Sequence, residues 1–256
     1  MSQELPPSYE SPVPSAPPGR VIVESPQVRP LVTYTLAGII IVTFLLQLGT
    51  ETAYGTDVPA LWGMKINSAI VEGQYWRLFT PMFLHGSILH IAFNLYALFI
   101  FGPGLERYYG HGRYLALFVI SGFAGNVMSF LFSSAPSLGS STAIFGLLGA
   151  EGVFLYQNRA VFGRGAQRAL TNLVVLALIN LFLGLSSPGI DNWGHIGGLI
   201  GGVLYAWFAG PVLRVDGVYP SLRLVNQREG NASLVAGIGV AVLFAILAMM
   251  GIYFKG

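Results

Sequence analysis

A small number of polar side chains lie in or beside long apolar stretches, where a polar group is costly unless it is paired or functional. Ser141 stands at the beginning of one stretch, and His195 begins another that is rich in glycine. A serine hydroxyl becomes a nucleophile when a neighbouring base removes its proton, and neutral imidazole suits that role near pH 7. Ser141 and His195 are therefore candidates for a dyad that transfers an acyl group.

A second pair of polar residues would stabilise the charge that forms during acyl transfer. His90 and Asn94 are four residues apart in a third apolar stretch, which places them on one face of a helix. With the backbone amide of Ser141, they would donate hydrogen bonds to a developing oxyanion. The chain has no cysteine, which excludes thiol nucleophiles and thiolate metal sites, and we expect neither a metal nor another cofactor.

Some of these residues also have a purely structural interpretation. A serine in the first turn of a helix caps free backbone amides, and a histidine at the beginning of a glycine-rich helix can serve in packing. Glu151 lies ten residues after Ser141, too deep for the dyad. We expect Glu151 near the inner membrane interface or hydrogen-bonded between helices; a role in gating or proton access is the alternative.

The elements that must position these residues are membrane helices. Of the 256 residues, 54% are hydrophobic and only 9% are charged, against roughly 25% charged in an ordinary soluble domain. The sequence therefore predicts an all-α polytopic membrane protein, whose sixth span, rich in glycine, packs closely against the fourth. Seven spans are expected, at residues 31–49, 87–103, 113–134, 141–157, 169–186, 193–210 and 233–254.

The basic residues predict how the chain is oriented. With a cytoplasmic N-terminus, ten arginines lie in inside segments, and only Lys65, Arg77 and Lys255 lie outside. The C-terminus is then outside, and Ser141 and His195 would meet below the outer surface. The net charge of +2 is spread along the chain and gives no basic block for nucleic acid. Residues 1–30 hold eight of the fifteen prolines and read as a disordered cytoplasmic tail.

Over residues 31–212 the chain resembles the rhomboid family of intramembrane serine proteases. The resemblance rests on motifs in a fixed order: Trp76-Arg77, His85 with His90 and Asn94, Gly102-Pro103 with Glu106 and Gly110, Gly139-x-Ser141 with Gly149, and His195 with Gly198 and Gly202. It implies a six-helix rhomboid-like catalytic core at 31–212, a cytoplasmic linker at 213–232 and one additional C-terminal transmembrane helix at 233–256.

The resemblance also implies a role for each candidate residue. Ser141 would be the nucleophile, favoured over Ser140 by its spacing to Gly139 and Gly149, and His195 the general base and then acid. His90, Asn94 and the Ser141 amide would form the oxyanion hole, Gly139 would make room for the substrate backbone, and His85 would support the site. Arg77 and Glu106 would be structural. Thr142 stands where the family usually has Gly or Ala, so it could narrow the site or add a competing hydroxyl.

The function implied is an intramembrane serine endopeptidase that hydrolyses peptide bonds in or near transmembrane segments of membrane proteins. Substrates would enter laterally from the lipid bilayer, between the second and fifth spans, under a cap at 187–192. The expected location is a bacterial cell membrane. Two other classes remain open: an inactive rhomboid-like protein that binds membrane clients, and a channel or transporter whose path is lined by His90, Asn94 and Glu151. The presence of both Ser141 and His195 favours the enzyme.

Overall fold

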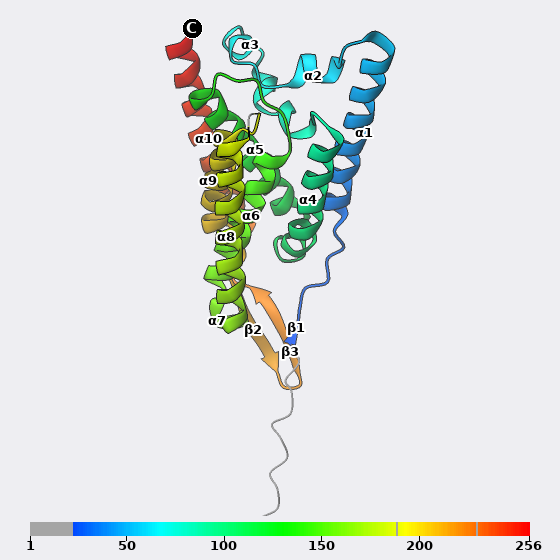
Figure 1. Cartoon of the computed structure of the whole chain (residues 1–256). Helices are drawn as coiled ribbons and strands as arrows, with labels where there is room; N and C mark the ends of the chain where they lie inside the picture. Colours follow the sequence, from blue (N-terminus) through cyan, green and yellow to red (C-terminus); the bar gives the residue numbers. More distant parts are fainter. Residues whose placement is uncertain (1–22, 188, 229) are drawn as a thin grey trace, which may run out of the picture.

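The structure is a computed structural model that describes residues 23–187, 189–228 and 230–256. Long helices run between two ends of the molecule, and a small sheet projects beyond one of them, here called the sheet end (Figure 1). The long helices are α1 (Leu31–Tyr54), α4 (Ile88–Tyr109), α5 (His111–Phe132), α6 (Ser141–Gln157), α8 (Arg164–Ser186), α9 (Asn192–Ala209) and α10 (Gly230–Lys255).

Each of the seven predicted spans coincides with one of these helices. Among the described residues, five helices are long and apolar enough to cross a membrane: α1, α4, α5, α8 and α10. The two others are the central helices: α6 has only 17 residues, and α9 begins with polar residues and contains several glycines. Because α6 and α9 are covered by other helices, neither needs a long lipid-facing surface. The count of seven crossings therefore stays a prediction.

Glycines bring the backbones of α5, α6 and α9 into direct contact at the centre of the bundle. A Cβ atom at Gly198 would collide with Thr142 O, and one at Gly202 with Gly146 O. A Cβ at Gly146 would meet the side chain of Ser121. Small residues let membrane helices approach closely because van der Waals contact holds the bundle in lipid. The expected packing of the sixth span against the fourth is present as the α6–α9 contact.

The segment that joins α1 to α4 is folded against the end of the bundle that lies opposite the sheet. It contains α2 (Val58–Gly63), α3 (Asn67–Val71) and two short 3-10 helices, η1 (Tyr75–Leu78) and η2 (Thr80–Phe83). Arg77 holds this segment together, since its guanidinium donates hydrogen bonds to Met64 O at 2.7 Å and Leu61 O at 2.9 Å. At the sheet end, buried Glu106 accepts bonds from the amides of Val32 and Thr33 at 2.8 Å. Both residues thus have the structural contacts expected of them.

A three-stranded sheet, in the order β1-β3-β2, departs from the prediction of an all-α fold. β2 (Leu213–Val218) and β3 (Ser221–Asn226) form an antiparallel hairpin, and β1 (Val23–Glu24) pairs with β3 in parallel. The hairpin lies in the predicted linker at 213–232, and β1 in the predicted tail at 1–30, whose residues 1–22 are outside the described part. Polar and apolar residues alternate from Ser221 to Leu224 and from Leu213 to Asp216, a strand pattern that could have been recognised.

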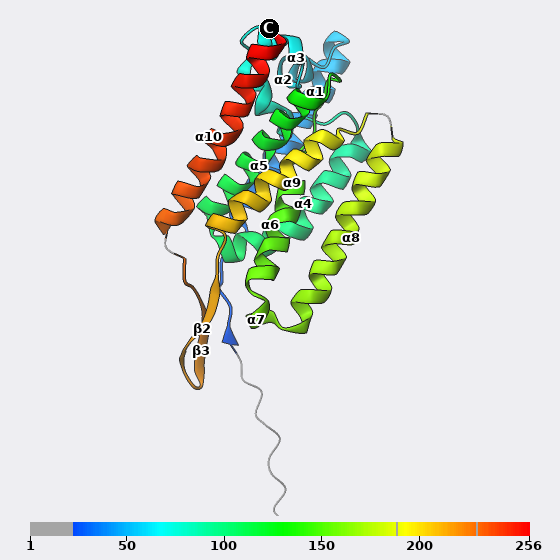
Figure 2. The ribbon, with the colours of Figure 1, turned by 90° about the vertical axis from the view of Figure 1, so that its left-hand side faces the viewer.

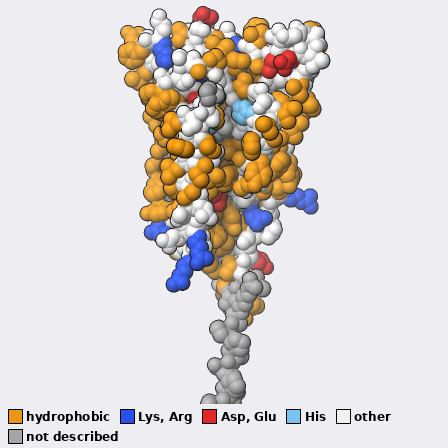
Figure 3. All heavy atoms as spheres, in the orientation of Figure 1, with side chains coloured by type: hydrophobic (Ala, Val, Ile, Leu, Met, Phe, Trp, Pro, Cys, Tyr) orange, Lys and Arg blue, Asp and Glu red, His pale blue; other side chains and the backbone are white. Residues whose placement is uncertain are grey.

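The surface of the bundle is apolar between its two ends. Apolar side chains cover most of the visible face, and most of its Lys and Arg atoms lie toward the sheet end (Figure 3). Large side chains such as Phe93 and Phe182 are about 70% exposed. A soluble protein does not expose so much contiguous apolar surface, whereas a bilayer covers it at no cost.

Candidate active site

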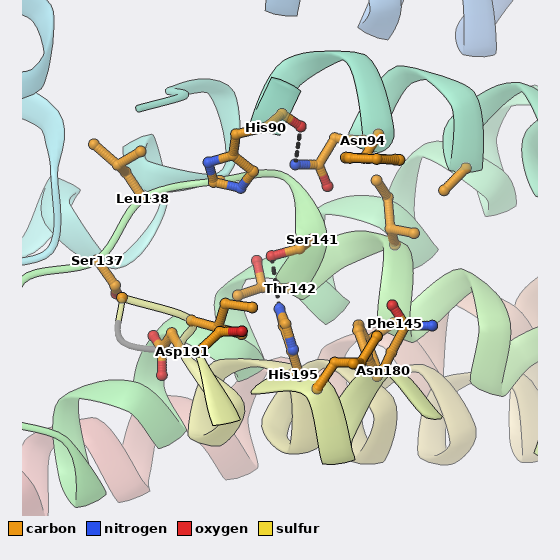
Figure 4. Close-up of a pocket in the computed structure, with 18 of the residues that line it drawn as sticks. His90, Asn94, Ser137, Leu138, Ser141, Thr142, Phe145, Asn180, Asp191 and His195 are labelled. Carbon is orange, nitrogen blue, oxygen red and sulfur yellow. Dashed lines mark hydrogen bonds between the residues drawn. The ribbon is translucent and has the colours of Figure 1, made fainter. Parts of the chain in front are cut away.

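Ser141 and His195 lie opposite each other in the first turns of α6 and α9. Ser141 Oγ is 2.9 Å from His195 Nε2, a hydrogen-bond distance (Figure 4). The ring of His195 stacks on Phe145, with centroids 4.2 Å apart and planes 9° from parallel. Asp191 caps α9, since its Oδ1 accepts a bond from Gly194 N at 2.9 Å. The cap and the aromatic stack together fix the imidazole in front of the hydroxyl.

The neighbouring serine faces away from this pair. Ser140 is fully buried, and its hydroxyl lies 3.1 Å from His85 Nε2. Burial, aided by the nearby charge of His90, lowers the pKa of His85 to about 3, so its imidazole is neutral at physiological pH and can accept a bond from Ser140. This geometry favours Ser141 over Ser140 as the nucleophile. His85 thus contacts the residue before Ser141, and its supporting role stays a prediction.

A cavity of about 610 Å³ opens beside the Ser141–His195 pair. Its walls come from α4, α5, α6, α8 and α9 and from the loops at 137–139 and 187–191. His90, Asn94 and Gly139 all line it, so the cavity brings together the residues that the sequence singles out. Phe93 of α4 and Leu183 of α8 contribute apolar wall on two sides. Pro188, in the expected cap, is outside the described residues.

His90 contacts both Asn94 and Gly139, the two other residues predicted to bind the oxyanion or the substrate. Asn94 Nδ2 donates a hydrogen bond to His90 O at 3.0 Å, which uses one of the two amide hydrogens and leaves the other for a ligand (Figure 4). A Cβ atom at Gly139 would lie only 2.7 Å from His90 Cε1 and Nε2. The missing side chain of Gly139 therefore makes room for the ring of His90, in addition to any room that it gives a substrate.

Comparison with known proteins decides the family. A sequence model of the Rhomboid domain matches residues 72–212, which is more than half of the chain. The chain belongs to the rhomboid family. With its several apolar helices, it is a multi-pass integral membrane protein. The match begins after α1, so it is shorter than the resemblance over 31–212.

Individual rhomboid relatives cover more of the chain. Rhomboid protease GluP of Bacillus subtilis (strain 168) is 39% identical over 216 residues, which are 84% of this chain and 40% of the relative. RHOMBOID-like protein 9, chloroplastic, of Arabidopsis thaliana is 38% identical over 160 residues, 62% of this chain and 37% of the relative. RHOMBOID-like protein 7 of Arabidopsis thaliana is 38% identical over 216 residues, 77% of this chain and 67% of the relative. The chain thus spans about two fifths of the length of the first two relatives.

In the described part of the chain, no carboxylate forms a hydrogen bond with His195. Within the described ranges, His195 Nδ1 is buried and makes no hydrogen bond, and Asp191 Oδ1 is used by the Gly194 amide. The arrangement is therefore a Ser-His pair. Likewise, no group of three or more His, Asp or Glu side chains that could hold a metal is found in the described part of this cysteine-free chain.

Thr142 stands where the rhomboid family usually has Gly or Ala, and two glycines make room for its larger side chain. Thr142 is 5% exposed and packs between α5 and α9. A Cβ at Gly125 would lie 2.6 Å from Thr142 Cβ, and one at Gly194 would lie 3.0 Å from Thr142 Cγ2. The extra volume of Thr142 thus fills space that these two glycines leave. Thr142 also lines the cavity, and its hydroxyl has no partner among the described residues.

Two residues that support the rhomboid site were not predicted from the sequence. Gln47 of α1 is 2% exposed; its side-chain oxygen accepts a bond from His85 N at 3.0 Å, and its Nε2 donates to Asp57 at 2.7 Å. Lys65 is fully buried and pairs through its backbone with Ser137, next to the loop that carries Gly139. An amide inside an apolar span was a usable signal for Gln47, as it was for Asn94.

Glu151 is separate from this site. It does not line the cavity of Ser141, in agreement with its expected depth. Its carboxylate is half-buried in α6, and no described side chain forms a hydrogen bond or ion pair with it. Among the described residues, no contact thus joins Glu151 to the Ser141–His195 pair, and its role stays a prediction.

Proposed function

We propose that this rhomboid protein is an intramembrane serine endopeptidase, which hydrolyses peptide bonds in or near transmembrane segments of other membrane proteins. The observation that carries the proposal is the 2.9 Å approach of Ser141 Oγ to His195 Nε2 at the wall of a cavity inside an apolar bundle. A nucleophile and a base at this distance are the minimal parts of acyl transfer.

In the proposed reaction, His195 takes the proton of Ser141 as the serine oxygen attacks the peptide carbonyl carbon. The tetrahedral oxyanion accepts hydrogen bonds from the Ser141 amide, from His90 and from the free amide hydrogen of Asn94. His195 then gives its proton to the leaving nitrogen, and an acyl-enzyme remains on Ser141. A water molecule, deprotonated by His195, attacks the acyl carbon and releases the new carboxyl end with a regenerated serine.

The substrate is proposed to reach the site from the side, between α4 and α8. Both helices contribute walls to the cavity, with Phe93 and Ala97 on α4 and Asn180 and Leu183 on α8. A transmembrane helix hides its carbonyls in hydrogen bonds, so a substrate must unwind locally before Ser141 can attack. Segments with Gly or Pro near the cut are therefore the favoured substrates.

The nucleophile assignment is tested with two matched variants. Ser141→Ala should abolish cleavage of a single-span model substrate, because it removes the hydroxyl that lies 2.9 Å from His195 Nε2. Ser140→Ala should leave measurable cleavage, because it removes only the contact with His85. Cleavage by Ser141→Ala, or its loss in Ser140→Ala alone, would overturn the assignment.

A fluorophosphonate probe separates an enzyme from a rhomboid-like protein that only binds clients. The probe should label the protein in detergent at Ser141, and His195→Ala should remove the label because the serine loses its base. Absence of label in the wild-type protein, with binding of client helices intact, would assign the protein to the non-cleaving class.

A further inference from the structure

A second cavity lies between α6, α8 and α9 and shares no lining residue with the cavity of Ser141. Its volume is about 500 Å³. Glycines and apolar side chains form the walls, among them Gly152 of α6, Leu173 of α8 and Val203 of α9, and the rings of Tyr156 and Trp207 also line it. We call this space the α8 groove. An apolar space of this kind offers no hydrogen bonds to hold water.

The α8 groove exists because α8 stands apart from the tightly packed pair α6–α9 (Figure 2). Only three of the 23 residues of α8 are buried, whereas nine of the 18 residues of α9 are. On α6, a Cβ at Gly149 would lie 2.9 Å from Leu199 O, so the backbones of α6 and α9 touch there. A Cβ at Gly152 would meet only Leu170 Cδ1 of α8, at 3.6 Å. Gly152 thus leaves open the space that a larger side chain would fill.

The end of the groove toward α7 (Arg159–Phe162) is aromatic and basic. The rings of Tyr156 and Trp207 stack with centroids 6.1 Å apart. The Arg159 guanidinium lies 4.5 Å from the centroid of the Tyr156 ring. Arg164 and Arg168 follow at the start of α8, and residues 156–190 include these three arginines but no Asp or Glu. Aromatic rings beside arginines are typical of the level of lipid headgroups.

We propose that the α8 groove binds one acyl chain of an anionic phospholipid, whose headgroup lies against Arg159, Arg164 and Arg168. The apolar walls suit a hydrocarbon chain, and the basic end suits a phospholipid headgroup whose net charge is negative. A protein helix does not fit, because three turns of helix, 10–12 Å across with side chains, occupy about 1500 Å³. The bound chain fills the space between α8 and the α6–α9 pair, and so supports a helix that has few contacts of its own.

The lipid preference is tested on the full chain in detergent, by native mass spectrometry after addition of phosphatidylglycerol or phosphatidylcholine with identical acyl chains. The wild-type protein should retain phosphatidylglycerol at least about fivefold more strongly, which is the factor expected for each arginine near an anionic headgroup. Arg159→Gln should reduce this preference without abolishing retention of phosphatidylcholine. Equal retention of the two lipids by the wild type would overturn the proposal.

The position of the acyl chain is tested by filling the groove. Gly152→Leu should lower retention of both lipids severalfold, and Leu173→Trp serves as a second filling variant if the first does not fold. Gly38→Leu is the matched control, because Gly38 is exposed on α1 with nothing within 4 Å of its Cβ position. Unchanged lipid retention in folded Gly152→Leu and Leu173→Trp would overturn the proposal. It would also be overturned if the wild type were a dimer and the filling variants were monomers, because the groove would then hold a second copy of the protein. No cleavage is measured, so the outcome is independent of the proposed protease activity.

Discussion

Gly139 holds its backbone at a φ of +136°, a conformation that L side chains rarely adopt, and its hydrogen faces the ring of His90. Gly139→Ala should therefore reduce cleavage by at least about tenfold, because the new methyl group displaces His90 or the loop before Ser141. The measurement is the cleavage rate of a single-span substrate, with the thermal unfolding of the variant followed in parallel.

Gly86→Ala is the control for this prediction. Gly86 is exposed beside the same loop, and a Cβ there would meet only Leu138 Cδ1 at an ordinary 3.6 Å. Gly86→Ala should cleave at close to the wild-type rate. A wild-type rate in Gly139→Ala would show that neither the position of His90 nor the conformation at residue 139 matters to the reaction.

At the scale of residues, the sequence was most informative where one polar group stands in an apolar stretch. Ser141 and His195 were expected at the same depth, and the structure has them within hydrogen-bond distance. The support of His85 by Gln47 was not predictable, because residues 38 positions apart meet only once α1 packs against the loop before α4. The glycines that make room for Thr142 also come from other helices, so their effect depends on tertiary packing.

Among the elements, α5 has the buried side chain of Lys65 at its C-terminal end. Lys65 Nζ donates hydrogen bonds to Ser133 O at 3.0 Å and to Ser129 O at 3.4 Å, where the helix leaves carbonyls unpaired. Burial lowers the pKa of Lys65 from 10.5 to about 8, against the opposing effect of Asp191. Below pH 8 the folded protein must keep a charge inside, whereas above pH 10.5 Lys65 is neutral in both folded and unfolded states.

The stability of the protein should consequently rise with pH in this window. Because the unfolded state binds the proton of Lys65 more tightly, the wild type should gain up to about 3 kcal/mol relative to Lys65→Met between pH 8 and 10.5. Thermal or denaturant unfolding of both proteins in detergent, at several pH values, measures the difference. A constant difference across the window would contradict the prediction.

Asn67→Ala provides the matched control for Lys65. Asn67 Nδ2 also bonds the carbonyls at the end of α5, to Ser133 O at 2.9 Å and Phe130 O at 3.2 Å, but the side chain does not titrate. Asn67→Ala should lower the free energy of unfolding by about 1–3 kcal/mol for the two lost hydrogen bonds, by the same amount at every pH.

The long helices were predictable because each carries a continuous apolar run, and the error at their ends is a few residues. The predicted span at 87–103 continues as α4 to Tyr109, and the one at 169–186 begins earlier, at Arg164. Polar and basic residues in those extensions end the apolar run, so a prediction based on apolar runs stops before the helix does. β1 was missed for a different reason: it has two residues and exists only through its pairing with β3.

For the whole molecule, the arginine-rich sheet end is expected on the cytoplasmic side. The absence of cysteine makes this orientation directly measurable, since any introduced thiol is the only one. In intact cells, a membrane-impermeant maleimide should label Glu72→Cys, which is exposed at the opposite end, but not Ser221→Cys on β3.

Permeabilised cells supply the control for the orientation. Ser221→Cys should become labelled after permeabilisation, because its side chain is exposed on the hairpin. Labelling of Ser221→Cys but not of Glu72→Cys in intact cells would reverse the orientation and place Ser141 near the cytoplasmic surface.

The two reacting side chains are attached to α6 and α9, whose backbones are in contact through Gly198 and Gly202. In the proposed lateral entry, the wall that a substrate would displace belongs to α8, which contributes neither to that contact nor to the Ser141–His195 pair. A displacement of α8 would therefore leave the direct contact between α6 and α9 in place. In the proposed reaction, opening of α8 then leaves the α6–α9 contact assembled and reaches the helix of His195 through the hydrogen bond from Asn192 Nδ2 to Leu181 O, at 3.0 Å. We therefore expect a slow opening of α8 to be able to limit turnover.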